Sequence, residues 1–208
     1  MSTISFAITA WNEHVELERL LDQLVTIIKP EDEIMVQLDN TATDEVKKVA
    51  TKYNVGQKFE YHRILSSLNG DFATFKNNVK NHCTRDWVFF IDADEYLSDG
   101  LAENIHDVLD MNKGLVDLIA VPRINTVEGL TRDHIDKWRW FVDDNGWVNY
   151  PDYQTRICAN KKEIKWANKV HERLTGWKTA ANLPEGYDLM HSKTIDRQER
   201  QNQFYNEI

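Results

Sequence analysis

The sequence has few cysteines and no long apolar segment. Its two cysteines, Cys83 and Cys158, are too few for a disulfide framework and have no metal-ligand spacing. No stretch approaches the roughly 20 consecutive apolar residues that a membrane-spanning helix needs. The first residues lack a basic region and reach an acid at Glu13, which is unlike a signal peptide. These absences predict a protein of the reducing cytoplasm.

The chain also lacks an excess of positive charge, because its formal net charge is −9. A general basic face for nucleic acid or anionic lipid is therefore not expected, although the C-terminal third holds candidates for a local basic patch. Low-complexity runs, internal repeats and the glycine-rich phosphate loops of common nucleotide-binding folds are absent. With 41% hydrophobic residues, the 208-residue chain is long enough for one large domain or two small ones.

Strand-like and helix-like segments alternate along the first half of the chain. Short apolar runs predict strands at residues 4–9, 33–39, 58–64 and 87–91. Helical spacing of apolar residues, with Pro30 closing the first segment, predicts helices at residues 13–30, 41–53 and 71–82. This alternation predicts an α/β fold with a mostly parallel sheet flanked by helices. Uninterrupted apolar strands fit such a sheet, because both of its faces are covered.

Polar residues follow several of the expected strands. Asn12 and Glu13 come after the first strand, Asp39 ends the second, and Asp92 and Asp94 follow the strand at 87–91. Ligands of open α/β sheets bind at the carboxyl ends of the strands. The sequence therefore predicts one functional site at this edge of the sheet.

The pair Asp92 and Asp94 is the strongest candidate for a metal site. In an extended stretch, residues two apart point the same way. Two neighbouring carboxylates repel each other, and a divalent cation removes that cost. Oxygen ligands favour Mg²⁺ or Mn²⁺. A solvated turn with helix-capping acids is the alternative, but the other polar strand ends favour a metal site.

The order of motifs resembles that of a known family. The segments "ISFAITAWNE", "VQLDNTATDE" and "NGDFATFKNNVKNHCTRDWVFFIDADEYL" resemble the nucleotide-sugar half of family 2 glycosyltransferases, which have the GT-A fold. Further on, "TRICANKKEIKWANKVHERL" and "LMHSKTIDRQERQNQFY" resemble segments of the lipopolysaccharide-core and peptide glycosyltransferases of that family. Departures are Asn40, Thr41 and Ala42 in place of a Gly-Ser-rich turn, and Lys76 where arginine is usual.

The resemblance implies a role for each matching residue. The nucleotide-sugar pocket would be lined by Ala10, Asn12, Glu13, Asp39, Lys76, Asp92, Ala93, Lys193 and Arg197. Asp39 would reach the base or ribose, and Asp92 would face the ribose. Lys193 and Arg197 would neutralise the diphosphate. Helix capping, a turn or a solvated helix face is the competing interpretation for most of these side chains.

Two further pairs complete the implied site. Asp94 would bind the metal, with His191 as a distal ligand, although a lone histidine is more often a packed or surface residue. Glu172 would act as the general base on the acceptor hydroxyl, and His171 is the alternative because its ordinary pKa suits proton transfer near neutrality. A salt-bridged strand end is the competing interpretation of Glu172.

The sequence is thus interpreted as a metal-dependent glycosyltransferase that uses Mn²⁺ or Mg²⁺ and a nucleotide-diphosphate sugar, and the resemblance alone implies that the transfer inverts the anomeric centre. Residues 1–122 would form the nucleotide-sugar half, and residues 123–208 a smaller acceptor-side and site-closing region of the same domain. Two alternatives stay open: a phosphohydrolase with Asp92 as nucleophile, and a non-catalytic sugar-binding module that uses the tryptophan-rich C-terminal third. The donor base and sugar are open, hexose or pentose included, and so is the acceptor: a glycan, lipid-linked sugar, peptide or modified base.

Overall fold

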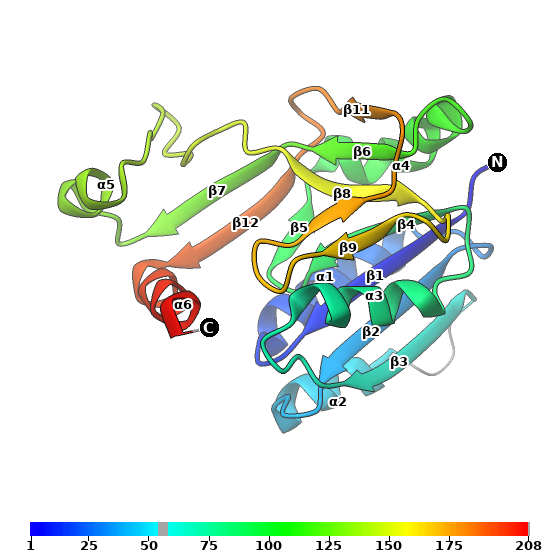
Figure 1. Cartoon of the computed structure of the whole chain (residues 1–208), viewed down its shortest axis with the longest axis horizontal. Coiled ribbons are helices and arrows are strands. Elements are labelled where there is room, and N and C mark those ends of the chain that lie inside the picture. The colour runs from blue at the N-terminus through cyan, green and yellow to red at the C-terminus, as the bar shows by residue number, and fades with distance from the viewer. Residues whose placement is uncertain (54–57, 208) are drawn as a thin grey trace.

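The computed structural model describes residues 1–53 and 58–207 (Figure 1). The helices are α1 (His14–Ile27), α2 (Asp44–Lys52), α3 (Phe72–His82), α4 (Asp99–Asn112), α5 (Arg132–Trp138) and α6 (Ile195–Glu207). The strands are β1 (Ile4–Ala10), β2 (Glu33–Asp39), β3 (Glu60–Ser66), β4 (Trp87–Asp92), β5 (Glu95–Leu97), β6 (Leu118–Val121), β7 (Arg123–Glu128), β8 (Gln154–Ala159), β9 (Lys165–Ala167), β10 (Arg173–Thr175), β11 (Ala180–Asn182) and β12 (Leu189–Thr194). None of these helices is long and apolar enough to cross a bilayer.

The main sheet has seven strands in the order β11-β6-β8-β4-β1-β2-β3. The pairs β1–β2, β1–β4, β2–β3 and β6–β11 are parallel, whereas β8 runs antiparallel to both of its neighbours, β4 and β6. The predicted mostly parallel α/β fold is therefore confirmed. The four predicted strands are present, and the first predicted helix ends at Ile27, because Ile28 already has extended backbone ahead of Pro30.

Both faces of the main sheet are covered, which explains the uninterrupted apolar strands. On one face, the alternate residues Ile4, Phe6 and Ile8 of β1 pack in a cluster with buried residues of α1, α2 and α4. On the other face, Ala7 lies in a second cluster with residues of α3 and of the two-stranded sheet β9–β10. This alternation follows from the two-residue period of a strand.

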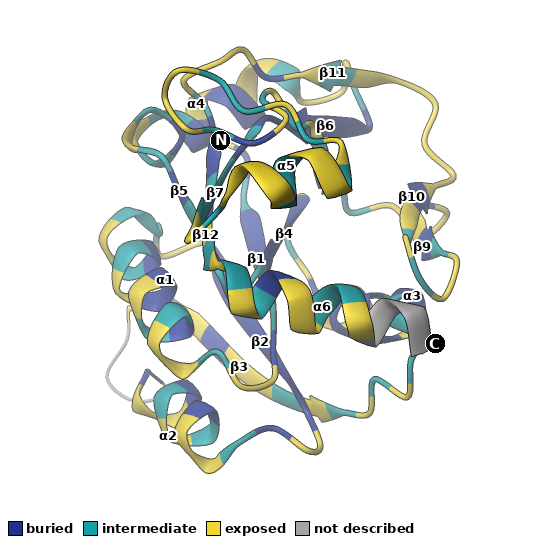
Figure 2. Cartoon of the chain, turned by 90° about the vertical axis from the view of Figure 1, so that its left-hand side faces the viewer, coloured by how far each residue is buried: buried dark blue, intermediate teal, exposed yellow. Residues whose placement is uncertain are grey.

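A three-stranded sheet, β5-β12-β7, extends from the carboxyl edge of the main sheet (Figure 1). Strand β12 continues directly into α6, and Figure 2 shows α5 and α6 lying across this end of the molecule. In the pairing of β12 with β5, His191 lies opposite Glu95. The small sheet therefore carries a C-terminal histidine to the acids that follow β4.

We expect the two sides of α1 to respond very differently to truncation. Leu21 is fully buried, whereas Val15 is 64% exposed. Leu21→Ala should lower the free energy of unfolding by about 2–5 kcal/mol, because it removes buried methyl groups and leaves a cavity. Val15→Ala should change it by less than about 0.5 kcal/mol. Denaturant unfolding of both variants tests this, and equal losses would contradict the packing of α1.

Candidate functional site

Acidic side chains follow strand β4 at the carboxyl edge of the main sheet. Asp92 is the last residue of β4, and Glu95 is the first of β5. Ala93 and Asp94 form the turn between the strands. The prediction that Asp92 and Asp94 lie on one extended stretch is wrong in this detail, because the strand ends between them. The turn still keeps the two carboxylates close enough to interact electrostatically.

Arg156 is a buried cation behind these acids. It lies on β8, the antiparallel neighbour of β4, and is 4% exposed. Its Nη2 atom is 2.6 Å from Asp92 Oδ2 and 2.6 Å from Glu95 Oε1. Glu95 is itself fully buried and also accepts a hydrogen bond of 3.0 Å from Arg123. The guanidinium thus fixes the spacing of the two carboxylates.

Electrostatics keep Asp92 ionised despite its surroundings. Burial alone would raise the pKa of Asp92, but Arg156 and Lys76 outweigh it and hold that pKa well below its usual range. In turn, the charges of Asp92 and Glu95 raise the pKa of Arg156 against the opposing effect of burial. The two groups are therefore charged at any physiological pH.

Lys76 connects the acids to the predicted general base. Its Nζ atom is 3.3 Å from Asp92 Oδ1 and 2.8 Å from Glu172 Oε1. The same nitrogen lies 4.9 Å from the centre of the Trp166 ring. Lys76 is only 5% exposed, so the alternative of a solvated lysine on α3 is wrong. His171, the other candidate base, is exposed and has positive φ.

Asp94 and His191 face each other across the site. Their Oδ2 and Nε2 atoms are 3.2 Å apart. Burial would raise the pKa of Asp94, but the hydrogen bond and charge of His191, together with the charge of Arg197, outweigh it and lower the pKa to about 2. Asn125 Oδ1 lies 2.8 Å from His191 Nδ1, and the amide of Asn125 donates to Asp152. These contacts hold the ring so that Nε2 points at Asp94.

The residues present fit a divalent cation between Asp94 and His191. A carboxylate oxygen and an imidazole nitrogen are ligand types that Mn²⁺ accepts, and a histidine ligand usually has its other ring nitrogen hydrogen-bonded. A different group with metal-ligand spacing, Glu33, Glu60 and His62, lies at the amino ends of β2 and β3. It is the poorer site, because the Glu33 carboxylate already accepts hydrogen bonds from Ser5 and Thr84.

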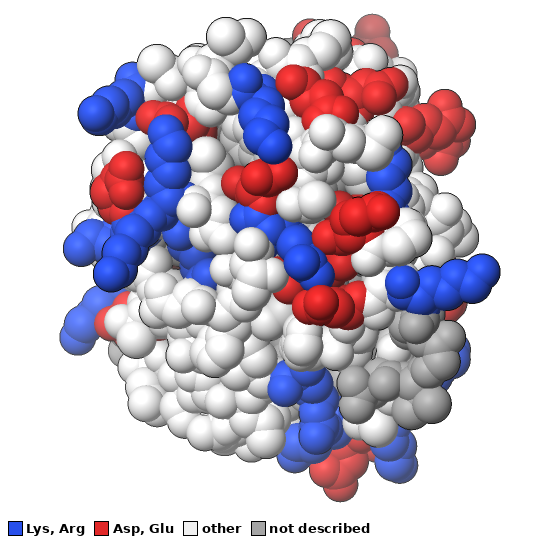
Figure 3. Space-filling model, turned by 90° about the vertical axis from the view of Figure 1, so that its right-hand side faces the viewer, with Lys and Arg blue, Asp and Glu red and all other residues white. Residues whose placement is uncertain are grey.

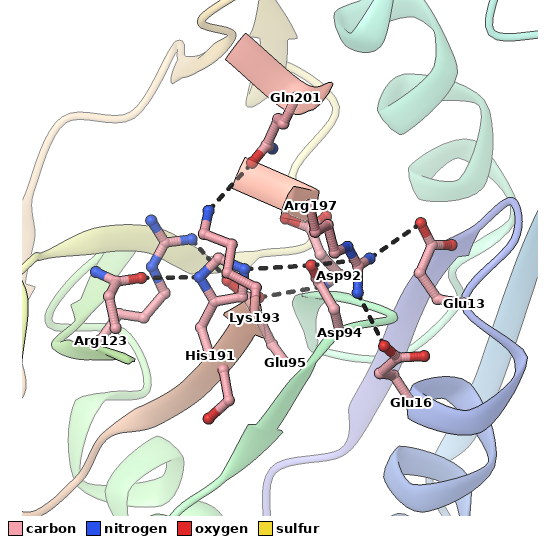
Figure 4. Close-up of polar contacts among 12 residues, drawn as sticks. Glu13, Glu16, Asp92, Asp94, Glu95, Arg123, His191, Lys193, Arg197 and Gln201 are labelled. Carbon is pink, nitrogen blue, oxygen red and sulfur yellow. Dashed lines mark hydrogen bonds and ion pairs between the residues drawn. The ribbon is translucent and has the colours of Figure 1, made fainter. Parts of the chain in front are cut away.

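Basic side chains from β12 and α6 close over the acids (Figure 4). Arg197 Nη1 is 2.9 Å from Glu16, and its Nη2 lies 3.3 Å from both Glu13 and Asp94. Lys193 donates a 3.1 Å hydrogen bond to Gln201. Burial lowers the pKa of Lys193 to about 8. The predicted diphosphate-binding cations therefore do lie beside Asp94.

The predicted nucleoside-binding residues lie at the ends of β1 and β2. Ala10 is buried and Asn12 is exposed. Glu13 accepts hydrogen bonds from the backbone of Trp11 and Asn12 in addition to its ion pair with Arg197.

Asp39 is already hydrogen-bonded within its own loop. Its carboxylate accepts from the backbone N–H groups of Thr41 and Leu68, each at 2.7 Å. Burial would raise the pKa of Asp39, but these bonds and that of the Thr41 hydroxyl lower it. Asp39 thus closes the turn, as its competing interpretation predicts, and its carboxylate is held ionised at the end of β2.

Sequence reasoning missed Arg156, Arg123, Asn125 and Asp152 as parts of the site. Arg156 lies within a segment that carries the family resemblance, but the sequence analysis gives it no role. The one available signal was an arginine inside an apolar strand, because a buried guanidinium requires a carboxylate partner. For Asn125 and Asp152 the sequence offers no comparable signal, because neither occurs in a recognisable motif.

Residues 5–169 match the family model described as glycosyl transferase family 2. Among proteins with curated functions, no sequence matches. One similar solved structure is S. aureus TarS 1–349 in complex with UDP-GlcNAc, with a TM-score of 0.66 and 14% identity over 92% of this chain and 58% of that chain.

Two other solved structures are also similar to this chain. Another structure of S. aureus TarS 1–349 gives a TM-score of 0.64 at 13% identity, over 91% of this chain and 60% of that one. The mannosyltransferase PcManGT from Pyrobaculum calidifontis, in complex with GDP-Man and Mn²⁺, gives 0.59 at 17% identity, over 90% and 56%.

The present chain thus spans about 60% of the length of the TarS 1–349 structure. At such low identities the likeness to solved structures establishes the GT-A fold alone. Because the family match extends over most of the sequence, the chain belongs to glycosyl transferase family 2.

Proposed function

We propose that this chain transfers a sugar from a nucleotide-diphosphate donor to an acceptor hydroxyl, with the help of Mn²⁺ or Mg²⁺. The observation that carries the proposal is the meeting of Asp92, Asp94, His191 and the Lys76–Glu172 pair at the carboxyl edge of a family 2 fold. It is supported by two structurally similar proteins, whose complexes hold UDP-GlcNAc in one case and GDP-Man with Mn²⁺ in the other.

The donor would lie across the ends of β1, β2 and β4. Residues proposed to line its pocket are Ala10, Asn12, Glu13, Asp39, Lys76, Asp92, Ala93, Lys193 and Arg197. Asp94 and His191 would hold the cation, which, when bound, acts as a Lewis acid on the leaving diphosphate. Arg197 forms ion pairs with three carboxylates, those of Glu13, Glu16 and Asp94. An incoming diphosphate would compete with these carboxylates for the guanidinium, which is already in position.

Glu172 is the proposed general base. In the transfer step its carboxylate takes the proton of the acceptor hydroxyl while that oxygen attacks the anomeric carbon. The bond from that carbon to the diphosphate oxygen breaks, and the configuration inverts. Lys76 supports this role by holding the Glu172 carboxylate, through a 2.8 Å contact, in the same site as Asp92. His171 is the alternative base.

The two halves of the chain contribute different residues to the proposed site. We propose residues 1–122 as the donor half and residues 123–208 as the acceptor-side region, which also supplies Arg156, Glu172 and His191. A phosphohydrolase with Asp92 as nucleophile is less well supported, because Arg156 and Lys76 occupy both of its carboxylate oxygens. A non-catalytic sugar-binding module would leave the ion pair of the buried Lys76 with Glu172 without a role.

Nucleotide binding tests the proposal. One of UDP, GDP, CDP, dTDP and ADP, together with Mn²⁺, should raise the melting temperature by about 5–10 °C at 100 times its Kd, because such binding adds ~2.7 kcal/mol. Asp94→Ala should abolish the metal-dependent shift, and Asp99→Ala, at an exposed acid nearby, should leave it intact. If no nucleotide shifts the melting temperature, or if Asp94→Ala responds like the wild type, the donor site is wrong.

Substitution of the proposed base separates chemistry from binding. Glu172→Gln should lower kcat for the donor selected above by about 10²–10⁴-fold, because a general base is lost, while the nucleotide-induced shift persists. Glu163→Gln, at an exposed glutamate of the same segment, is the matched control. The activity of both variants is measured as the rate at which the nucleoside diphosphate is released. Full activity in Glu172→Gln together with a large loss in His171→Asn would assign the base to His171.

A further inference from the structure

The segment from Lys161 to Lys178, which contains β9 and β10, is strongly basic in an acidic protein. It holds six Lys or Arg residues and two Glu, a formal charge of +4 in a chain of −9. All six cations are exposed: Lys161, Lys162, Lys165, Lys169, Arg173 and Lys178. Figure 3, which views the molecule from the right-hand side of Figure 1, shows Lys and Arg side chains gathered along one side of that view. We call this segment the basic hairpin.

The basic hairpin separates its apolar and charged residues onto two faces. Trp166 and Leu174 are paired across β9 and β10 and are buried, and the Trp166 ring meets Phe90 edge-on at 5.1 Å. Lys165 and Arg173 alternate with these residues and therefore lie on the opposite, outer face. Lys165 and Arg173 are therefore not part of the packing against the sheet, which Trp166 and Leu174 of the other face provide.

The cations of the basic hairpin have little internal compensation. Lys161 forms an ion pair of 2.6 Å with Asp117. The other five cations have no ion pair within 4 Å in the described part of the chain. Like charges clustered in this way repel one another, and a bound polyanion would relieve that repulsion.

The basic hairpin is fixed beside the proposed catalytic site. Asn77 of α3 donates to the carbonyl oxygen of Trp166 and accepts from its N–H group, at 2.8 and 2.9 Å. The backbone N–H of Phe72 donates to the carbonyl oxygen of Lys169 at 2.9 Å. Between the two strands, Glu172 reaches Lys76. The cationic surface therefore adjoins Glu172, the proposed general base, because Arg173 directly follows Glu172 in the chain.

We infer that the acceptor is an anionic glycan, bearing phosphate or carboxylate groups, that lies along the outer face of the basic hairpin. This inference rests on the proposed function, because it assigns the chemistry of the acceptor at the same site. In a protein of net negative charge, an anionic acceptor would be repelled by most of the surface and attracted to this one. The basic hairpin would thus direct the hydroxyl of the acceptor toward Glu172.

Dextrans of one length test the inference, because the same backbone can be left neutral, phosphorylated or carboxymethylated. The hairpin variant carries Lys162→Gln, Lys165→Gln, Lys169→Gln and Lys178→Gln. The control variant carries Lys48→Gln, Lys52→Gln, Lys58→Gln and Lys113→Gln, which remove the same charge elsewhere. Kd is measured at low and at physiological salt. Nucleoside diphosphate binding with Mn²⁺ is measured on every variant.

The expected result is that at least one charged dextran binds, that added salt weakens it, and that neutral dextran does not bind. The hairpin variant should weaken binding at least tenfold and the control variant less than twofold, with nucleotide binding unchanged in both. The tighter of the two charged dextrans identifies phosphate or carboxylate.

Three results would overturn the inference. If both variants bind the charged dextrans equally while nucleotide binding persists, the inference fails and the proposed function stands. If a single-stranded oligonucleotide of equal charge binds as tightly through the same lysines, the surface is not selective for glycans. If no nucleotide binds any variant, the proposed function fails and the acceptor assignment falls with it.

Discussion

The site depends on one buried interaction, the contact of Arg156 with Asp92 and Glu95. Removing a guanidinium from water costs several kcal/mol, and only close carboxylates offset that cost. Both carboxylates lie 2.6 Å away, that of Asp92 at the end of β4 and that of Glu95 at the start of β5. Because β8 pairs with both β4 and β6, the cation that orders these acids is part of the main sheet. Fold and site are therefore stabilised by the same contacts.

The contacts of Arg156 belong to a longer series of ion pairs and hydrogen bonds that includes residues of both halves of the protein. In order, its members are Glu172, Lys76, Asp92, Arg156, Glu95, Arg123, Asp152, Asn125, His191, Asp94 and Arg197. It runs from the proposed base to the proposed metal ligands. Loss of an inner member would leave a buried charge unpaired, which costs more than the pair itself contributes. Such a network holds the proposed catalytic groups in place before any ligand arrives.

Much of this arrangement could be predicted from the sequence. Apolar periodicity identified the strands and helices of the first half, and the carboxyl-edge rule predicted that Asp92 and Asp94 would share a site. The resemblance to family 2 added His191 and Glu172, which no local pattern singles out. Insertion of β8 between β4 and β6 could not be predicted, because the pairing of strands that lie far apart in the sequence leaves no periodic signal. The roles of Arg156, Asn125 and Asp152 likewise follow from contacts between separate segments that no local pattern shows, and Lys76 could be mistaken for a solvated lysine.

The position of the bound metal tests whether Asp94 and His191 form the proposed cation site. Crystals would be soaked with Mn²⁺ and the nucleoside diphosphate that stabilises the protein, and anomalous scattering would locate the metal. We expect a manganese peak within coordination distance of Asp94 and His191, with the diphosphate between the metal and Arg197. A peak at Glu33, Glu60 and His62, or a bound nucleotide with no manganese near Asp94, would contradict it.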